Sequence, residues 1–247
     1  MFSNVKRSIQ KSTFLVLVVS RLYAFLNHII SLFWRYKVKF TCHVSNSAKI
    51  IGWRNVHLSS NCVISSGSWI NVNNRGVSEG ICVDIGKNTF LGRNNFLTVG
   101  RRISIGPYCL TASNCSFIGS SHVVSNPLLP YISTGVTQTS DIVVGTNCFF
   151  GYGASVLGSV KIGHGCIVGA HTVITKNVPP FSIVVGNPGV VIKRYDFEKS
   201  KWVRNDEYSE SSIMSENEYI EKLENEHGSR IPFMPLSVSN TFFGDMP

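Results

Sequence analysis

The chain has 247 residues, a formal net charge of +9 at neutral pH, 43% hydrophobic residues and 15% charged residues. This balance excludes a disordered chain, which would combine low hydrophobicity with many charges. The positive charge suits an anionic membrane or a phosphorylated small molecule as partner. Nucleic acid is disfavoured, because the sequence has no zinc-finger spacing, no RNA-binding signature and no run of five or more basic residues.

The first 40 residues predict an amphipathic helix. From Phe14 to Trp34 the sequence is apolar apart from a narrow polar stripe with helical period. Basic residues on both sides of this stretch favour a helix that lies on the membrane surface. A helix buried within the protein or its oligomer and a membrane-spanning helix both stay open, although Arg21 would be costly inside a bilayer.

The seven cysteines indicate a reducing compartment. Their number is odd, the sequence has no Cys-x-x-Cys pair, and several cysteines stand where a repeat needs small core residues. We therefore predict free thiols and a cytoplasmic protein. Together with the N-terminal helix, this predicts a peripheral location on the inner face of the cell membrane.

Residues 41–195 carry a repeat of six residues. Between Val144 and Ile174 an apolar residue stands at every sixth position, and a small or β-branched residue follows each of them four positions later. The repeat is weaker upstream and is interrupted at Asn71–Gly80, which predicts an inserted loop. A period of six fits short strands joined by sharp corners, with equivalent strands of successive coils paired. The residues predict an all-β parallel solenoid and leave its handedness open.

Residues 196–247 predict a C-terminal tail with one short helix. Ser215–His227 has Ser215 as N-cap, acidic residues in the first turn, and Tyr219 and Leu223 one turn apart. The helix is expected to pack on the solenoid or on a neighbouring chain. A partly ordered tail is the alternative.

The segment Asp141–Tyr195 resembles the C-terminal coils of hexapeptide-repeat acetyltransferases. The runs Thr175–Pro180 and Gly186–Pro188 are similar to the branch of maltose and galactoside acetyltransferases and of capsule and lipopolysaccharide O-acetyltransferases. The resemblance implies a left-handed β-helix, a homotrimer and active sites in the clefts between subunits. It also implies acetyl transfer from acetyl-CoA, without a metal, to a sugar hydroxyl of a surface polysaccharide or its precursor.

His122 is the catalytic residue that the resemblance implies. It stands where the repeat breaks, before a proline, at the start of an excursion that runs to about Ser140. An imidazole can remove the proton of a sugar hydroxyl near neutral pH. The corner positions of His164 and His171 instead predict exposed side chains.

The remaining site residues are also carried over by position. Asn94 is expected to touch the acceptor, although the Asn-x-Asn of the maltose branch is incomplete here. Phe149 stands where the family has an aromatic residue beside the acyl group, and Tyr152 where a backbone N–H faces the thioester oxygen. Four residues are expected along the acetyl-CoA groove: Ala170, Thr175, Lys176 and Lys193.

Three alternatives compete with this interpretation. A zinc site of three histidines is disfavoured, because the spacing from His164 to His171 does not supply two ligands about five residues apart. The acceptor could instead be a free small molecule, either a sugar or the hydroxyl of serine. The repeat could also be a non-catalytic scaffold. An excursion that carries a histidine, beside an intact groove at Lys176, argues against the scaffold.

Overall fold

The computed structural model describes residues 19, 22, 41–73, 80–208 and 213–227. The chain divides into two units, Met1–Tyr36 and Lys37–Pro247, and the fold below is that of the second. Apart from two positions, the predicted N-terminal helix lies outside the described residues. Within the described ranges, no helix is both long enough and apolar enough to cross a bilayer.

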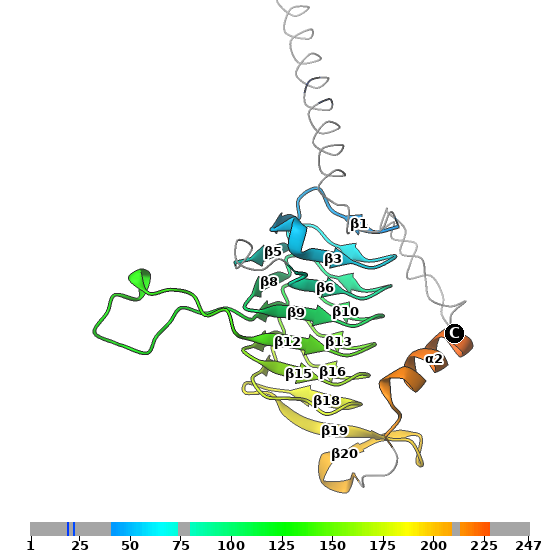
Figure 1. The fold of residues 1–247 in the computed structure, drawn as a ribbon. Coiled ribbons are helices and arrows are strands. Elements are labelled where there is room, and N and C mark those ends of the chain that lie inside the picture. The colour runs from blue at the N-terminus through cyan, green and yellow to red at the C-terminus, as the bar shows by residue number, and fades with distance from the viewer. Residues whose placement is uncertain (1–18, 20–21, 23–40, 74–79, 209–212, 228–247) are drawn as a thin grey trace, which may run out of the picture. The chain divides into compact units, whose positions relative to one another are not determined.

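The second unit is a stack of coils whose short strands form three sheets (Figure 1). The five-stranded sheet contains β3 (Val56–Leu58), β6 (Val83–Ile85), β9 (Arg102–Ile105), β12 (Asp141–Val144) and β15 (Val160–Ile162). The six-stranded sheet contains β2 (Lys49–Ile51), β5 (Trp69–Val72), β8 (Phe96–Val99), β11 (Ser116–Ile118), β14 (Ser155–Leu157) and β17 (Val173–Ile174). The nine-stranded sheet contains β1 (His43–Val44), β4 (Val63–Ile64), β7 (Phe90–Leu91), β10 (Leu110–Thr111), β13 (Phe149–Phe150), β16 (Ile167–Val168), β18 (Ser182–Val185), β19 (Val190–Asp196) and β20 (Lys201–Arg204).

Each coil runs through the five-stranded, the nine-stranded and then the six-stranded sheet, and equivalent strands of successive coils pair in parallel. The predicted parallel solenoid is therefore confirmed. Among the paired strands of the described residues, β18–β19 and β19–β20 are the two antiparallel pairs. Through these two pairs, β19 and β20 extend the nine-stranded sheet, which ends at Arg204. Three short 3-10 helices complete the coil unit: η1 (Trp53–Asn55), η2 (Tyr131–Ser133) and η3 (Asn205–Glu207).

The core is a column of inward-facing side chains, one or two from each short strand. Phe117 and Phe150 are fully buried, and their ring centroids lie 5.2 Å apart in an edge-to-face arrangement. Buried cysteines fill the corners beside this column, as in Cys115, whose Sγ lies 3.2 Å from Gly151 O. All seven cysteines are thiols, as predicted. Burial raises the pKa of Cys115 to about 11.

Three corners join the sheets. The α2 corner, named after the helix α2 (Glu216–His227), joins the five-stranded to the nine-stranded sheet. The Asn94 corner joins the nine-stranded to the six-stranded sheet, and the His122 corner joins the six-stranded sheet to the next coil. Asparagine stands at several sharp turns with a left-handed backbone, a conformation that it tolerates better than most residues. These asparagines are Asn61, Asn88, Asn94, Asn114 and Asn147.

The predicted C-terminal helix is confirmed as α2 (Glu216–His227). The Ser215 N–H donates to Glu218 Oε2 at 2.8 Å, and the Glu218 N–H donates to Ser215 Oγ at 3.3 Å, which is a capping box. Hydrogen bonds and an ion pair attach the helix to the α2 corner. The Glu216 carboxylate accepts hydrogen bonds from the Thr146 N–H and hydroxyl at 2.7 and 2.9 Å, and Glu224 pairs with Lys87.

Candidate active site

His122 lies at the base of an excursion that leaves the stack at the His122 corner (Figure 1). The base is a short antiparallel ribbon. His122 bridges Val136, and the Val123 N–H donates to Gly135 O at 2.8 Å. The side chains from Ser121 to Pro130 are all exposed. The predicted break of the repeat at this position is therefore confirmed, and His122 is accessible.

An ion pair fixes the point where the excursion returns to the coil. The Arg101 Nε donates to Asp141 Oδ1 at 2.8 Å, directly after the excursion ends, and the Arg101 N–H donates to Ser140 O at 2.8 Å. The guanidinium holds the pKa of the Asp141 carboxyl below its ordinary value, so the pair stays charged at neutral pH. Both ends of the excursion are thus attached to the stack close to His122.

Tyr152 lies at the Asn94 corner and forms a cluster there with two residues that the sequence analysis did not single out as functional. Its hydroxyl accepts a hydrogen bond from Asn114 Nδ2 at 2.6 Å, and its ring lies 5.3 Å from that of His171. The His171 N–H donates to Tyr152 O at 2.8 Å. Within the described part of the chain, no group accepts a hydrogen bond from the Tyr152 N–H. That N–H is available to a ligand.

Phe149 and Ala170 lie near this cluster. Phe149 is exposed on the outer face of the nine-stranded sheet, three residues before Tyr152. It lies beside the exposed Leu110 of the neighbouring strand β10. Ala170 belongs to the next turn of the Asn94 corner and lies against Gly151. The structure therefore brings Phe149, Tyr152 and Ala170 to one edge of the coil.

Asn94 is a turn residue of the same corner, two coils before Tyr152. Its backbone is left-handed, with φ of 55°, and its N–H donates to Ser66 O at 3.0 Å. Its side-chain oxygen occupies the space where a Cβ of residue 67 would stand, which explains the glycine at that position. The fold therefore accounts for Asn94, and contact with an acceptor stays a prediction.

Two of the predicted donor residues follow β17 at the His122 corner. Thr175 and Lys176 are exposed there, whereas Ala170 precedes the same strand at the Asn94 corner. Lys193 is exposed on β19, which begins directly after Gly189. The Gly189 N–H donates to Val173 O at 2.8 Å, so the turn before β19 is attached to β17. The four residues thus flank the last coil from two of its corners and from β19.

His122 and Tyr152 stand at opposite edges of the six-stranded sheet. A strand such as β11 separates the two corners, and three to five extended residues at about 3.3 Å each span roughly 10 to 17 Å. This separation exceeds hydrogen-bond reach by several-fold. One chain alone therefore does not bring the two residues to a single reacting atom.

The prediction that His164 is exposed is wrong. Only 6% of its surface is accessible, its Nε2 donates to Met214 O at 2.9 Å, and its ring packs edge-on against Phe181 at 4.8 Å. The C-terminal segment before α2 covers it. His171 is exposed, as predicted.

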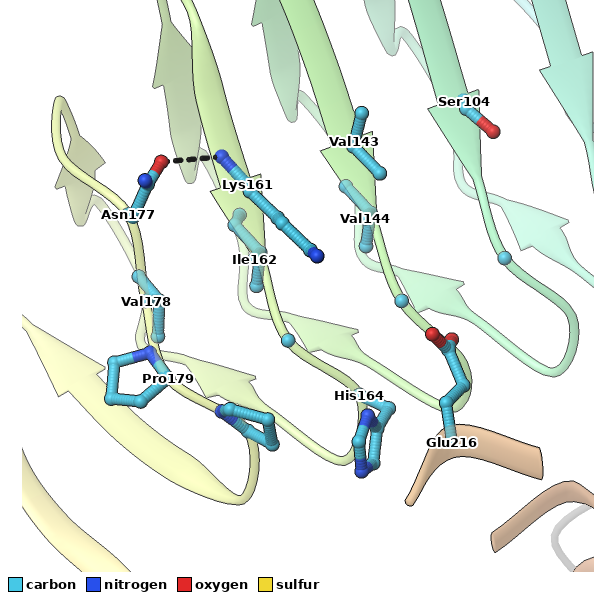
Figure 2. Close-up of a pocket in the computed structure, with 14 residues that line it drawn as sticks. Ser104, Val143, Val144, Lys161, Ile162, His164, Asn177, Val178, Pro179 and Glu216 are labelled. Atoms are coloured by element: carbon cyan, nitrogen blue, oxygen red, sulfur yellow. Dashed lines mark hydrogen bonds between the residues drawn. The ribbon is translucent and has the colours of Figure 1, made fainter. Parts of the chain in front are cut away.

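A groove of about 720 Å³ lies on the outer face of the five-stranded sheet, beside the start of α2. Lys161, Asn177 and Glu216 line it, together with His164 (Figure 2). Asn177 Oδ1 accepts a hydrogen bond from the Lys161 N–H at 2.8 Å. None of the eight predicted site residues lines this groove. We therefore treat it as separate from the candidate active site.

Comparisons with known proteins identify the repeat. Residues 141–176 match a family model described as bacterial transferase hexapeptide (six repeats). The chain carries the hexapeptide repeats of bacterial transferases. The resemblance to hexapeptide-repeat transferases seen in the sequence is thereby confirmed.

Relatives with this hexapeptide repeat are described as acetyltransferases. The chain is 34% identical over 125 residues to such a protein of Staphylococcus aureus (strain MRSA252), covering 51% of this chain and 61% of the relative. It is 31% identical over 130 residues to another of Mycobacterium tuberculosis (strain ATCC 25618 / H37Rv), covering 51% and 43%. The chain thus spans about three fifths or less of the length of these relatives.

The hexapeptide fold itself is found in a solved structure. AntD, an N-acyltransferase from Bacillus cereus in complex with dTDP and 3-hydroxybutyryl-CoA, matches with a TM-score of 0.57 and 16% identity. The match covers 70% of this chain and 90% of AntD. The likeness therefore extends over most of the coil unit and concerns the fold.

Proposed function

We propose that the protein is an acetyltransferase that moves an acetyl group from acetyl-CoA to a sugar hydroxyl, with His122 as general base. The observation that carries the proposal is the position of His122 at the base of an exposed excursion from a hexapeptide coil. The relatives described as acetyltransferases and the coenzyme A derivative bound to AntD support the donor. Exposed loops on a rigid scaffold commonly carry function.

The proposed step conserves every atom. The His122 imidazole takes the proton of the acceptor hydroxyl while its oxygen adds to the thioester carbonyl. The Tyr152 N–H donates to the oxygen that becomes negatively charged in the tetrahedral intermediate. The carbon–sulfur bond then breaks, the acetyl ester remains on the sugar, and the imidazolium returns its proton to the thiolate of coenzyme A. No metal enters this step.

The separation of His122 from Tyr152 supports a homotrimer with sites between subunits. If both residues act on one thioester, they must come from two chains, since a single chain holds them at opposite edges of a sheet. Two exposed apolar regions would supply contacts between such chains: the outer face of the nine-stranded sheet at Leu110 and Phe149, and the tip of the excursion. Ile132 at that tip is 93% exposed. Apolar groups gathered at a surface mark interaction sites.

The donor would lie along the last coil. In this proposal Ala170 and Thr175 line the path of the pantetheine arm, and Lys176 and Lys193 contact the phosphates of coenzyme A. The exposure of both lysines supports this role, since a flexible ammonium on an open surface suits a phosphate. Phe149 would pack against the acetyl group.

The acceptor proposed here is a surface polysaccharide or its lipid- or nucleotide-linked precursor. The basic and apolar residues 1–40 would attach the protein to the inner face of the cell membrane. The protein would be cytoplasmic apart from that contact.

The test is incubation of the full chain with acetyl-CoA, a thiol-detecting reagent and a panel of acceptors. The panel contains neutral oligosaccharides, sugar nucleotides with and without an amino group, and serine. Thiol release that depends on a sugar without an amino group, with an acetyl ester found by mass spectrometry, supports the proposal. Release with amino sugars or serine only would replace O-acetylation of sugars with another acceptor class. Absence of release with every acceptor would favour a non-catalytic scaffold.

A further inference from the structure

The outer face of the six-stranded sheet carries an aromatic ladder in its first coils. Trp69 is 39% exposed on β5, and its ring centroid lies 5.3 Å from that of Phe96, which faces outward on the paired strand β8. Lys49, the partner of Trp69 on β2, places its Nζ 5.1 Å from the indole centroid. An aromatic surface thus lies on the outer face of the sheet and not in the core.

A cluster of polar side chains adjoins this ladder on the same face. Asn71 and Thr98 follow Trp69 and Phe96 by two residues on the same strands, so they point the same way. Asn73 Nδ2 donates to Thr98 Oγ1 at 2.9 Å and to Ser120 Oγ at 2.7 Å, and Asn71 Nδ2 donates to Asn73 Oδ1 at 2.6 Å.

Counting hydrogens shows what this cluster can still offer. The hydroxyl oxygens of Thr98 and Ser120 lie 2.6 Å apart, so one hydroxyl hydrogen lies between them and the other is left to donate elsewhere. Both amide hydrogens of Asn73 are already used. Asn71 keeps its carbonyl oxygen and one amide hydrogen, because no hydrogen bond among the described residues uses them. The cluster therefore has both a donor and an acceptor available to a neutral polar ligand.

The cluster leads directly to His122. Ser116, Ile118 and Ser120 occupy alternate positions that face outward from β11 and its continuation. His122 follows Ser120 by two residues, where the chain leaves the coil for the excursion. The aromatic ladder and the polar cluster thus share one face of the coil, and the proposed general base follows directly in the chain.

We propose that this face is the acceptor subsite and that it binds a neutral pyranose chain, with one sugar ring stacked on Trp69. The C–H face of a pyranose ring suits the negative face of an indole, and its hydroxyl rim suits amide and hydroxyl side chains. The outward positions along β2, β5 and β8 hold no acidic residue, and Lys49 is their one basic residue. Such a surface favours a neutral polyol over a highly charged ligand. The inference rests on the proposed function and names the part of the acceptor that the protein would recognise.

Binding can be tested without turnover. We would titrate the full-length protein with maltotriose, cellotriose, N-acetylchitotriose, UDP-glucose and UDP alone, and follow tryptophan fluorescence. The inference expects a saturable response to at least one ligand that contains a pyranose ring. The affinity for that ligand should fall at least about tenfold in Trp69→Ala and about two- to tenfold in Asn71→Ala. Trp202→Ala, which changes another partly exposed tryptophan on β20, is the matched control and should keep the wild-type affinity.

Several results would overturn the inference. They are no response to any sugar, an equal response to UDP alone and UDP-glucose, or Trp69→Ala binding as tightly as wild type. Dissociation of the oligomer by Trp69→Ala would also overturn it, because the ring would then be a subunit contact. In transfer assays, the inference expects a higher KM for the acceptor in Trp69→Ala and an unchanged KM for acetyl-CoA. Sugar binding without any transfer would contradict the proposed function and leave the subsite standing.

Discussion

Gly163→Ala tests whether the repeat glycines are required by the close approach of successive coils. A Cβ built on Gly163 would lie 2.4 Å from Pro180 N and 2.6 Å from Pro180 Cα, well inside van der Waals contact. Both atoms belong to the backbone of the next coil, so no side-chain rotation relieves the clash. Forcing extra volume into a packed site costs about 1 to 3 kcal/mol, and a rigid neighbour favours the upper end. We therefore expect a loss of about 3 kcal/mol.

The assay is the midpoint of thermal unfolding, and a matched control is available in the same chain. For a chain of this size, about 3 kcal/mol lowers Tm by roughly 6 to 12 °C. Gly135→Ala, in the excursion, adds its Cβ where no described atom lies within 4 Å, so its Tm should change by no more than roughly 2 °C. Equal Tm values for the two variants would refute the argument that coil spacing dictates glycine at position 163.

Three further predictions follow from the site, the core and the N-terminal segment. Lys176→Ala and Lys193→Ala should each raise the KM for acetyl-CoA with a smaller effect on kcat, because a phosphate contact is similar in ground and transition states. If steady-state kinetics show an unchanged KM for acetyl-CoA in both variants, the assignment of these lysines to donor binding is wrong. The six buried cysteines, with Cys115 at a pKa of about 11, should resist iodoacetamide at pH 8 in the native protein and react after denaturation, as mass spectrometry would measure. Deletion of residues 1–40 should release the protein from anionic vesicles in a flotation assay and preserve transfer to soluble acceptors, whereas retained vesicle binding would count against the membrane contact.

The coil region was predictable because its constraint is local. Each short strand must supply an inward side chain and each corner a small residue, so a period of six is visible from Val144 to Ile174. The capping box at Ser215 is likewise contained in a few adjacent residues. Such features depend on spacing alone, and spacing is what a single sequence displays.

Features made by distant segments were not predictable. His164 looks like an ordinary corner residue, and its burial depends on Met214, 50 residues later. The cluster around Asn73 requires residues from three coils, two of which follow an interruption of the repeat. The six-residue repeat did not predict the antiparallel strands β19 and β20, because strands paired in this way at the end of the stack lack that period.

The candidate site was predictable in part for a related reason. His122 was singled out because the repeat visibly breaks there. The pairing of Tyr152 with Asn114 and His171 was missed, although Asn114 and His171 occupy equivalent corner positions and Tyr152 stands one residue before that position in the coil between them. The signal that could have found it is the alignment of the coils themselves, which places the corner residues in one row.

The comparison of His122→Ala with the wild-type protein tests the central claim most directly. Initial rates of acetyl transfer to a sugar acceptor would be measured at neutral pH, with acetyl-CoA affinity measured separately. His43→Ala serves as control, since His43 lies on β1, far along the stack from the excursion. The account predicts that kcat falls about 10²- to 10⁴-fold in His122→Ala, with unchanged acetyl-CoA binding. A His122→Ala variant that keeps more than about a third of the wild-type kcat would contradict the account, because the loss would lie far below that of a general base.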